Sequence, residues 1–366
     1  MSLSPSGRKA LSAGLFALTL TFTPSAAMAA SAAKKPPIAV GVNIASAPDQ
    51  LAPMQSYAQI AGAKPAIVMW YQAWSEPLYY SDQLANMKTF GGVPMITWDP
   101  VLASGGVPLA DIVNGNYDSY IWASARQAAA WGSLMYIRFG HEMNLSGSPF
   151  GPGVNGNTPA EFVAAWRHVV TIFRLAGATN VEWVWSPNVN CGGQCPFTSF
   201  YPGDSWVDWV ALDGYNYSTV DNMPWMTFSQ IFGPSYTSLE SLTSKPVMIG
   251  ETASAEASGS KATWITQAFL QQIPASYPNV HAVVWFDRDK ETDWRVNSSA
   301  SSLTAWDQVV SSSLYRGTPA TLQTLLPTSG DVTASKTSTT SSTSGSASTT
   351  TTAKSSTSSR PGALAG

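Results

Sequence analysis

The chain has 366 residues, with 19 Lys and Arg against 22 Asp and Glu, which gives a formal net charge of −3. A slightly negative chain lacks the basic surface of a general nucleic-acid binder, so no nucleic-acid partner is expected. Two cysteines are too few for a disulfide-dense scaffold or a cysteine-rich zinc module. The 15 tryptophans indicate either a large apolar core or a surface that stacks on flat ligands.

Residues 1–29 have the pattern of a secretory signal peptide. Arg8 and Lys9 precede an uncharged run over residues 10–22, and the small residues at 27–29 form an A-x-A cleavage site. The uncharged run is too short to cross a bilayer, which takes about 20 apolar residues. We therefore expect the mature protein to have no membrane span and to be secreted, either extracellular or cell-wall associated.

The opposite end, residues 327–366, is predicted to be a disordered Ser/Thr-rich tail. Of the 30 residues from Asp331 to Arg360, 21 are Ser or Thr, and no aromatic residue follows Tyr315. Such a segment buries too little apolar surface to offset its conformational entropy. A linker, a wall-associating tail and a glycosylated stalk all remain open. The part between the two ends, residues 38–318, is predicted to form one catalytic domain.

Eight short apolar, β-branched or aromatic runs in this middle part predict strands. They are Ile38–Ile44, Ala66–Trp74, Val93–Trp98, Leu134–Phe139, Val181–Trp185, Trp206–Leu212, Lys245–Gly250 and Val280–Phe286.

The stretches between these runs have helical character. The clearest starts at Thr158, with Pro159 at the first helical position and Glu161 completing a capping box. Further helices are predicted over Ser81–Phe90, Asp118–Trp131 and Lys261–Ile273.

Eight strands that alternate with helices predict an α/β fold, a single (β/α)8 TIM barrel. A doubly wound open sheet is the alternative. That fold usually has a Gly-rich nucleotide turn after its first strand, and residues 41–45 (GVNIA) do not form one.

The active site of such a barrel lies at the carboxyl ends of the strands. The residues just past each strand are rich in carboxylates and aromatic rings, and they lack the Gly-rich turn of a phosphate site; they are Asn43, Trp74, Asp99, Glu142, Asn188, Asp213, Tyr215, Glu251 and Asp287. Glycosidic bond cleavage needs two carboxyl groups that flank the bond. Glu142 and Glu251 follow the fourth and seventh strands, so both can face the barrel mouth.

The segment around the first of these carboxylates, Arg138-Phe139-Gly140-His141-Glu142-Met143-Asn144, resembles the R-x-x-H-E-M-N signature of glycoside hydrolase family 26, a retaining family of clan A. The similarity continues through residues 208–216 (DWVALDGYN), 245–251 (KPVMIGE) and 284–287 (VWFD) and covers nearly all of residues 38–313.

The resemblance implies a role for each residue of the site. Glu142 would be the acid/base and Glu251 the nucleophile. His141 would contact the sugar or the surroundings of the nucleophile, and Arg138 would orient carboxylates. The other expected binding or supporting residues are Asn144, Tyr215, which would hydrogen-bond Glu251, Trp285, which would be the platform beneath the reacting sugar, Trp74 and Asp287.

The resemblance favours β-1,4-mannan as substrate, with mixed-linkage β-1,3-1,4-glucan or β-1,3-xylan as alternatives. Many family members, mannanases especially, have Gly and then an aromatic cluster after H-E-M-N. Here residues 145–150 (LSGSPF) follow instead. The loop after H-E-M-N therefore does not match that of the mannanases, and mannan specificity is the part of the family resemblance with the least support from the sequence.

Other reactive side chains suggest structural roles. Only His141 lies past a strand end, so no zinc site and no cofactor are expected. Residues 287–293 (DRDKETD) alternate acids as calcium loops do but lack the EF-hand glycine and glutamate, so a polar loop is favoured over a calcium site. In an exported chain, Cys191 and Cys195 are expected to form a disulfide.

The sequence therefore predicts a secreted, monomeric, retaining endo-β-glycosidase whose partner is a polysaccharide. A non-catalytic carbohydrate-binding barrel is the competing class, and it would be indicated by loss of a catalytic carboxylate. An aldolase or isomerase barrel is disfavoured because no Lys at a strand end is placed to form a Schiff base.

Overall fold

The computed structural model describes Met1 and residues 35–220 and 223–325. The predicted signal peptide, residues 1–29, lies outside the described residues except for Met1, and the predicted tail, residues 327–366, lies outside them entirely. No helix in the described ranges is long and apolar enough to cross a membrane.

Eight parallel strands close into a barrel, which confirms the predicted (β/α)8 fold. Their order around the barrel is β1-β10-β9-β8-β7-β6-β3-β2. The strands are β1 (Ala39–Ile44), β2 (Ile67–Ala73), β3 (Val93–Asp99), β6 (Met135–Phe139), β7 (Val181–Trp185), β8 (Trp209–Asp213), β9 (Val247–Thr252) and β10 (Val280–Asp287). The barrel closes between the first and last strands, where Val42 pairs with Trp285.

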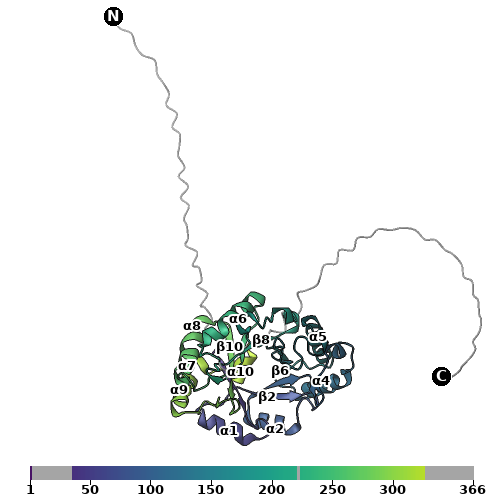
Figure 1. Cartoon of the computed structure of the whole chain (residues 1–366), viewed down its shortest axis with the longest axis horizontal. Coiled ribbons are helices and arrows are strands. Elements are labelled where there is room, and N and C mark those ends of the chain that lie inside the picture. The colour runs from purple at the N-terminus through teal and green to yellow at the C-terminus, as the bar shows by residue number, and fades with distance from the viewer. Residues whose placement is uncertain (2–34, 221–222, 326–366) are drawn as a thin grey trace, which may run out of the picture.

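Helices surround the barrel, with α1 and α2 on one side of it and α4 and α5 on another (Figure 1). They are α1 (Leu51–Ile60), α2 (Ser81–Phe90), α3 (Leu109–Val113), α4 (Asp118–Trp131), α5 (Pro159–Leu175), α6 (Phe228–Leu242), α7 (Lys261–Gln267), α8 (Ile273–Ser276), α9 (Ala300–Ser311) and α10 (Pro319–Gln323). A π-helical turn over Ala268–Gln272 joins α7 to α8. A small hairpin, β4 (Val101–Leu102) and β5 (Gly105–Gly106), follows β3.

The capping box predicted at Thr158 is present. The Thr158 hydroxyl accepts a hydrogen bond from the backbone N–H of Glu161, and the Glu161 carboxylate accepts one from the backbone N–H of Thr158. Pro159 occupies the first turn, where its missing N–H costs no helical hydrogen bond. The helix therefore starts where the sequence indicates.

Alternation along the strands divides the core in two. In β2, Ile67 and Met69 belong to a cluster inside the barrel, whereas Val68 and Trp70 belong to the larger cluster between sheet and helices. The interior cluster is apolar, and Leu322 of α10 packs against it. Residues further along the inward face therefore lie above an apolar floor, at the carboxyl end of the barrel.

Candidate active site

A buried arginine forms the base of the site. Arg138 continues the inward face of β6 and is completely buried. Its guanidinium donates to both carboxylate oxygens of Asp213 at 2.9 Å and to the Thr97 hydroxyl at 2.9 Å. It also donates to Glu251. A buried charge is tolerated only with such partners, so Arg138 orients two carboxylates, as the resemblance implied.

Glu251 is held as a carboxylate by three donors. Besides Arg138, the Tyr71 hydroxyl donates to its Oε1 at 2.7 Å and the Tyr215 hydroxyl donates to its Oε2 at 2.5 Å. Burial alone would raise the pKa of Glu251, but the charges of Arg138 and His141 and the Tyr215 hydrogen bond lower it to about 2. Glu251 is therefore ionised at any physiological pH.

A bulge in β9 points Glu251 inward. Met248 lies inside the barrel and Ile249 lies outside, so strict alternation would direct Glu251 outward. The pairing with β8 shifts between Leu212 and Asp213, and this irregularity reverses the direction of the side chain. A Cβ at Gly250 would lie 2.5 Å from Asp213 Oδ1, so only glycine fits there. The functional carboxylate thus depends on a local departure from strand geometry.

Glu142 occupies strained backbone just beyond β6. Its φ is 52°, a left-handed value that non-glycine residues rarely adopt, and Gly140, two residues earlier, has a φ of 53°. Its backbone N–H donates to the Ser186 carbonyl at 2.8 Å, and its Oε1 accepts from the Asn188 amide at 2.7 Å. The backbone contact holds the left-handed conformation of Glu142, and the side-chain contact fixes the position of its carboxyl group.

Burial raises the pKa of Glu142, and the negative charge of Glu251 raises it further, while His141 acts in the opposite direction. The pKa values of the two carboxyl groups are therefore shifted in opposite directions. The shift favours the protonated form of Glu142 and the ionised form of Glu251. This is the arrangement by which one fold supplies an acid and a charged group at the same pH.

His141 forms an ion pair with Asp99. Its Nδ1 lies 2.9 Å from Asp99 Oδ1. Burial would lower the pKa of His141, but the Asp99 charge and hydrogen bond raise it to about 9. His141 is therefore a cation at neutral pH, and its charge favours the ionised form of Glu251.

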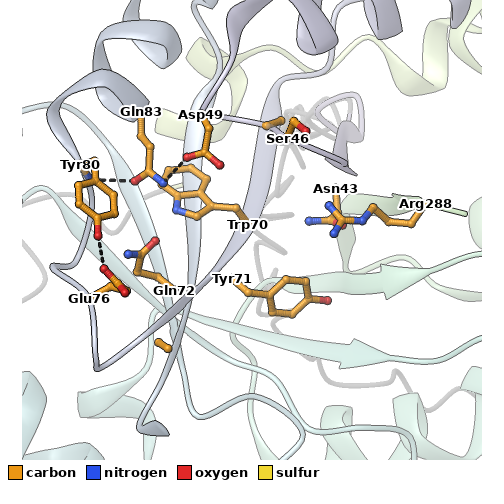
Figure 2. A pocket seen from close by; sticks show the side chains of 12 residues that line it. Asn43, Ser46, Asp49, Trp70, Tyr71, Gln72, Glu76, Tyr80, Gln83 and Arg288 are labelled. Carbon is orange, nitrogen blue, oxygen red and sulfur yellow. Dashed lines mark hydrogen bonds between the residues drawn. The ribbon is translucent and has the colours of Figure 1, made fainter. Parts of the chain in front are cut away.

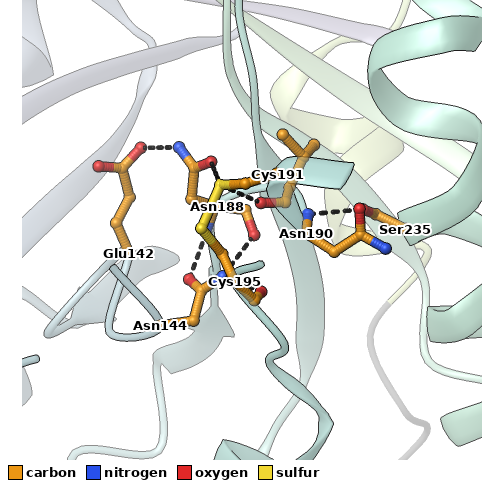
Figure 3. The surroundings of a disulfide bond; sticks show 8 residues. Glu142, Asn144, Asn188, Asn190, Cys191, Cys195 and Ser235 are labelled. Carbon is orange, nitrogen blue, oxygen red and sulfur yellow. Dashed lines mark hydrogen bonds between the residues drawn. A yellow bond between two sulfur atoms is a disulfide. The ribbon is translucent and has the colours of Figure 1, made fainter. Parts of the chain in front are cut away.

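A disulfide-bonded loop supports the acid side of the site (Figure 3). Cys191 and Cys195 are joined within the loop that follows β7. Asn144 is buried and donates to the carbonyls of Asn188 and Cys195 at 2.9 and 2.8 Å, and it accepts from the Asn188 N–H. The loop therefore fixes Asn188, which in turn holds Glu142.

The two carboxylates share one pocket of about 200 Å³. His141 and Tyr215, both expected at the site, also line this pocket. Six further residues line the pocket: Tyr71, Tyr217, Phe286, Lys290, Glu291 and Trp294. Strand alternation could have identified Tyr71, which continues the inward face of Ile67 and Met69, and Phe286, which continues that of Val284 in β10. The other four residues lie past strand ends, where this alternation does not apply.

The prediction that Trp285 is the sugar platform is wrong. Its side chain is fully buried between sheet and helices, packed against Trp264, Phe269 and Trp306. The reason is alternation in β10, because Val284 faces the barrel interior and Trp285 therefore faces outward. Its indole N–H donates to the Trp294 carbonyl at 3.0 Å, so it holds the loop that brings Trp294 to the pocket.

Trp74 also offers no face to a sugar. It is 3% exposed and packs among the rings of Trp98, Tyr117, Tyr120 and Phe139. Trp74 continues the outward face of Val68 and Trp70, so it lies in the core between the sheet and the helices.

The loop after β10 is clamped by buried polar groups. Asp287 accepts from the Val296 N–H at 2.7 Å, and burial raises its pKa to about 6. Lys261, completely buried, donates to the carbonyls of Asp293 and Arg295 and to the Ser298 hydroxyl. The ammonium group of Lys261 thus binds the carbonyls of this loop.

Within the described ranges, no group of three or more His, Cys, Asp or Glu side chains is arranged to hold a metal.

Residues 134–306 match the family described as "Glycosyl hydrolase family 26". Endoglucanase H of Acetivibrio thermocellus is 39% identical over 282 residues, which cover 74% of this chain and 30% of that protein. The chain thus spans less than a third of that relative.

Solved structures of other proteins share the fold, and two of them show the extent of the similarity. One is the family 26 domain of an endo-β-mannanase/endo-β-glucanase from Prevotella bryantii, with a TM-score of 0.56, 15% identity and coverage of 76% of this chain and 90% of that one. The other is a β-mannanase from Bacteroides ovatus, with a TM-score of 0.57, 18% identity and coverage of 77% and 90%.

Proposed function

Because the barrel of this chain belongs to glycoside hydrolase family 26, we propose that it is a secreted retaining endo-β-glycosidase that cleaves a β-linked polysaccharide by double displacement. The observation that carries the proposal is the pair of carboxyl groups in one pocket whose pKa values move in opposite directions. A binding barrel without catalysis would need no such pair.

In the first step, ionised Glu251 attacks the anomeric carbon while protonated Glu142 gives its proton to the departing glycosidic oxygen. The glycosidic bond breaks, and an ester forms between the sugar and Glu251. In the second step, Glu142 removes a proton from water, which attacks the anomeric carbon and releases Glu251. Arg138 and the Tyr71 and Tyr215 hydroxyls hold Glu251 for attack, and Asn188 holds Glu142.

We assign a β-glucan as the preferred substrate. The relative at 39% identity is named an endoglucanase. In addition, Phe150, the single aromatic residue of the loop 145–153, is buried, and its ring lies 6.4 Å from that of His141. The loop therefore offers no exposed ring for sugar stacking, unlike the aromatic cluster of typical family mannanases.

β-1,4-Mannan is the second candidate, because the structural neighbours include proteins named mannanases. Export by the predicted signal peptide agrees with the disulfide, which is typical of oxidising compartments. Action as a monomer at the cell surface or outside the cell is part of the same proposal.

Two variants test the roles of the carboxylates. Glu251→Ala should lose hydrolysis of every glycoside, because no group remains to form the ester. Glu142→Ala should lose the polymer but retain the first step on aryl glycosides whose leaving groups need no proton. Glu240→Gln, a glutamate of α6 that does not line the pocket, is the matched control and should stay active. Equal loss in Glu142→Ala on activated and natural substrates would contradict the acid/base assignment.

The stereochemistry and the sugar need separate measurements. NMR of the first product formed should show the β-anomer, because two inversions restore the configuration. Catalytic efficiency on mixed-linkage glucan, β-1,4-glucan, β-1,3-xylan and β-1,4-mannan then ranks the substrates. Efficient use of mannan with no cleavage of any glucan would overturn the substrate assignment and leave the carboxylate roles intact.

A further inference from the structure

The loop between β10 and α9, residues 288–299, forms one wall of the pocket that Glu142 and Glu251 share. We call it the β10–α9 loop. Three of its side chains line the pocket: Lys290, Glu291 and Trp294. The rings of Trp294 and Tyr215 lie 5.4 Å apart, and the Tyr215 hydroxyl donates to Glu251. The position of the loop therefore decides the shape of the space in which the reacting sugar lies.

Arg288 anchors the start of the β10–α9 loop. Its side chain lies at the carboxyl end of the barrel, in a hollow that it lines together with Asn43 and Tyr71 (Figure 2). The guanidinium donates to the carbonyl of Ile44, the last residue of β1, at 3.0 Å. The first residue of the loop is thus bound to the strand that pairs with β10.

Lys261 anchors the second half of the loop. Its ammonium group donates to the carbonyls of Asp293 and Arg295 at 3.1 and 2.6 Å and to the Ser298 hydroxyl at 2.9 Å. A lysine ammonium has three N–H donors, so these contacts use all of them. Every one of these acceptors belongs to the β10–α9 loop, whereas Lys261 lies at the start of α7. One charged side chain thus joins the loop to a neighbouring helix.

The position of Lys261 is unfavourable for a cation in two respects. The side chain is completely buried, and a buried ammonium is tolerated only with hydrogen-bond partners. It is also the first residue of α7, where the positive end of the helix dipole repels a cation. Burial lowers the pKa of Lys261 to about 8 against the opposing effect of nearby carboxylates, so the side chain is mainly charged at pH 7. The contacts with the loop therefore offset both costs.

A carboxylate on the loop after β9 completes the arrangement. Glu256 accepts hydrogen bonds from the hydroxyls of Ser298 and Ser302, each at 2.7 Å. Its charge also favours the ammonium form of Lys261. Ser298 therefore contacts both charged groups, and the β10–α9 loop is tied to the segment that follows Glu251 in the chain.

We propose that Lys261 is a positioning residue for hydrolysis, which holds the pocket-lining side chains of the β10–α9 loop against the reacting sugar. The kinetic part of this inference rests on the proposed glycosidase function. Lys261 contacts the backbone of the loop and not the reacting groups, and Arg138 and Tyr71 hold Glu251 independently of it. Loss of the ammonium group should therefore raise KM more than it lowers kcat.

Removal and replacement of the ammonium group test the proposal. Lys261→Ala deletes the propylammonium part of the side chain. We expect KM for the preferred β-glycan to rise about ten-fold and kcat to change less than about three-fold. Added propylammonium should lower KM toward the wild-type value, and 1-propanol, which has the same shape without the charge, should not. A fall in kcat at unchanged KM, or equal effects of the two additives, would overturn the proposal.

Trypsin tests the loop without any substrate. The loop has cleavage sites at Lys290 and Arg295, whose side chains are 64% and 45% exposed. Proteolysis follows the population of the opened segment, so cleavage at these sites should be about ten-fold faster in Lys261→Ala than in the wild-type protein. Mass spectrometry of the fragments locates the cut. Unchanged cleavage at these two sites would show that Lys261 does not hold the loop.

Lys64 provides a matched control. Its ammonium donates to the Phe90 carbonyl at 2.8 Å and lies 5.6 Å from the Phe90 ring, much as Lys261 lies 5.8 Å from the ring of Trp285. Lys64→Ala should change neither KM nor cleavage of the β10–α9 loop, and equal effects of the two variants would contradict the proposal.

A milder variant covers the case in which Lys261→Ala does not fold. Ser298→Ala removes one of the acceptors of Lys261 and should change KM and loop cleavage in the same directions but by less. No change in either measurement would overturn the proposal. If the wild-type protein hydrolyses no β-glycan, the proposed function fails, and trypsin cleavage alone decides whether Lys261 holds the loop.

Discussion

The ion pair of His141 and Asp99 should make the stability of the protein depend on pH. The folded pKa of His141, about 9, lies above its ordinary value of 6.5. A raised histidine pKa contributes stability that is fully present below pH 6.5 and is lost as the pH rises through 9. The gap corresponds to about 3 kcal/mol in the free energy of unfolding.

Asp99→Asn removes the charge and keeps the size of the side chain, so it isolates this contribution. We expect the variant to be destabilised by about 3 kcal/mol more at pH 6 than at pH 10. Urea unfolding of both proteins at the two pH values measures the difference, and groups that titrate identically in both proteins cancel.

The chain supplies a matched control in a second His–Asp pair. His168 Nε2 lies 2.6 Å from Asp118 Oδ1, but the side chains are 28% and 40% exposed. Solvent screens such a pair, so Asp118→Asn should change stability by less than about 1 kcal/mol at either pH. Equal destabilisation of Asp99→Asn at pH 6 and pH 10 would refute the account of His141 as a partly buried cation held by Asp99.

Four further changes have defined outcomes. Asn188→Ala removes a donor that lowers the pKa of Glu142, so the alkaline limb of kcat/KM should move to higher pH, and an unmoved limb would count against that contact. Trp285→Ala should lower the free energy of unfolding by about 3–5 kcal/mol, and weaker substrate binding without this loss would restore its role as a platform. Lys261→Met leaves two loop carbonyls without their donor, at about 1–3 kcal/mol each in denaturant unfolding. Thr158→Ala should cost about 1 kcal/mol through the lost helix cap, and an unchanged melting temperature would contradict it.

Local chemistry written in the sequence determines the order and type of the elements. The capping box at Thr158 and the apolar runs define α5 and the strands, because capping and alternation involve neighbours a few residues apart. The same alternation places Arg138 inside the barrel. It also directs Trp285 outward, so the platform role that the family resemblance implied for Trp285 was wrong because this residue lies on the outward face of β10.

Only the closed barrel decides how the site is assembled. Tyr71 and Glu251 are 180 positions apart in sequence, and they meet because the barrel closes between β1 and β10. The bulge beside Gly250 and the left-handed backbone of Glu142 reverse what regular geometry predicts for each carboxylate. These departures are stabilised by Arg138 and other partners distant in sequence, so no local pattern encodes them. The sequence therefore determines which residues reach the mouth of the barrel, and tertiary contacts determine where they point and which of them ionise.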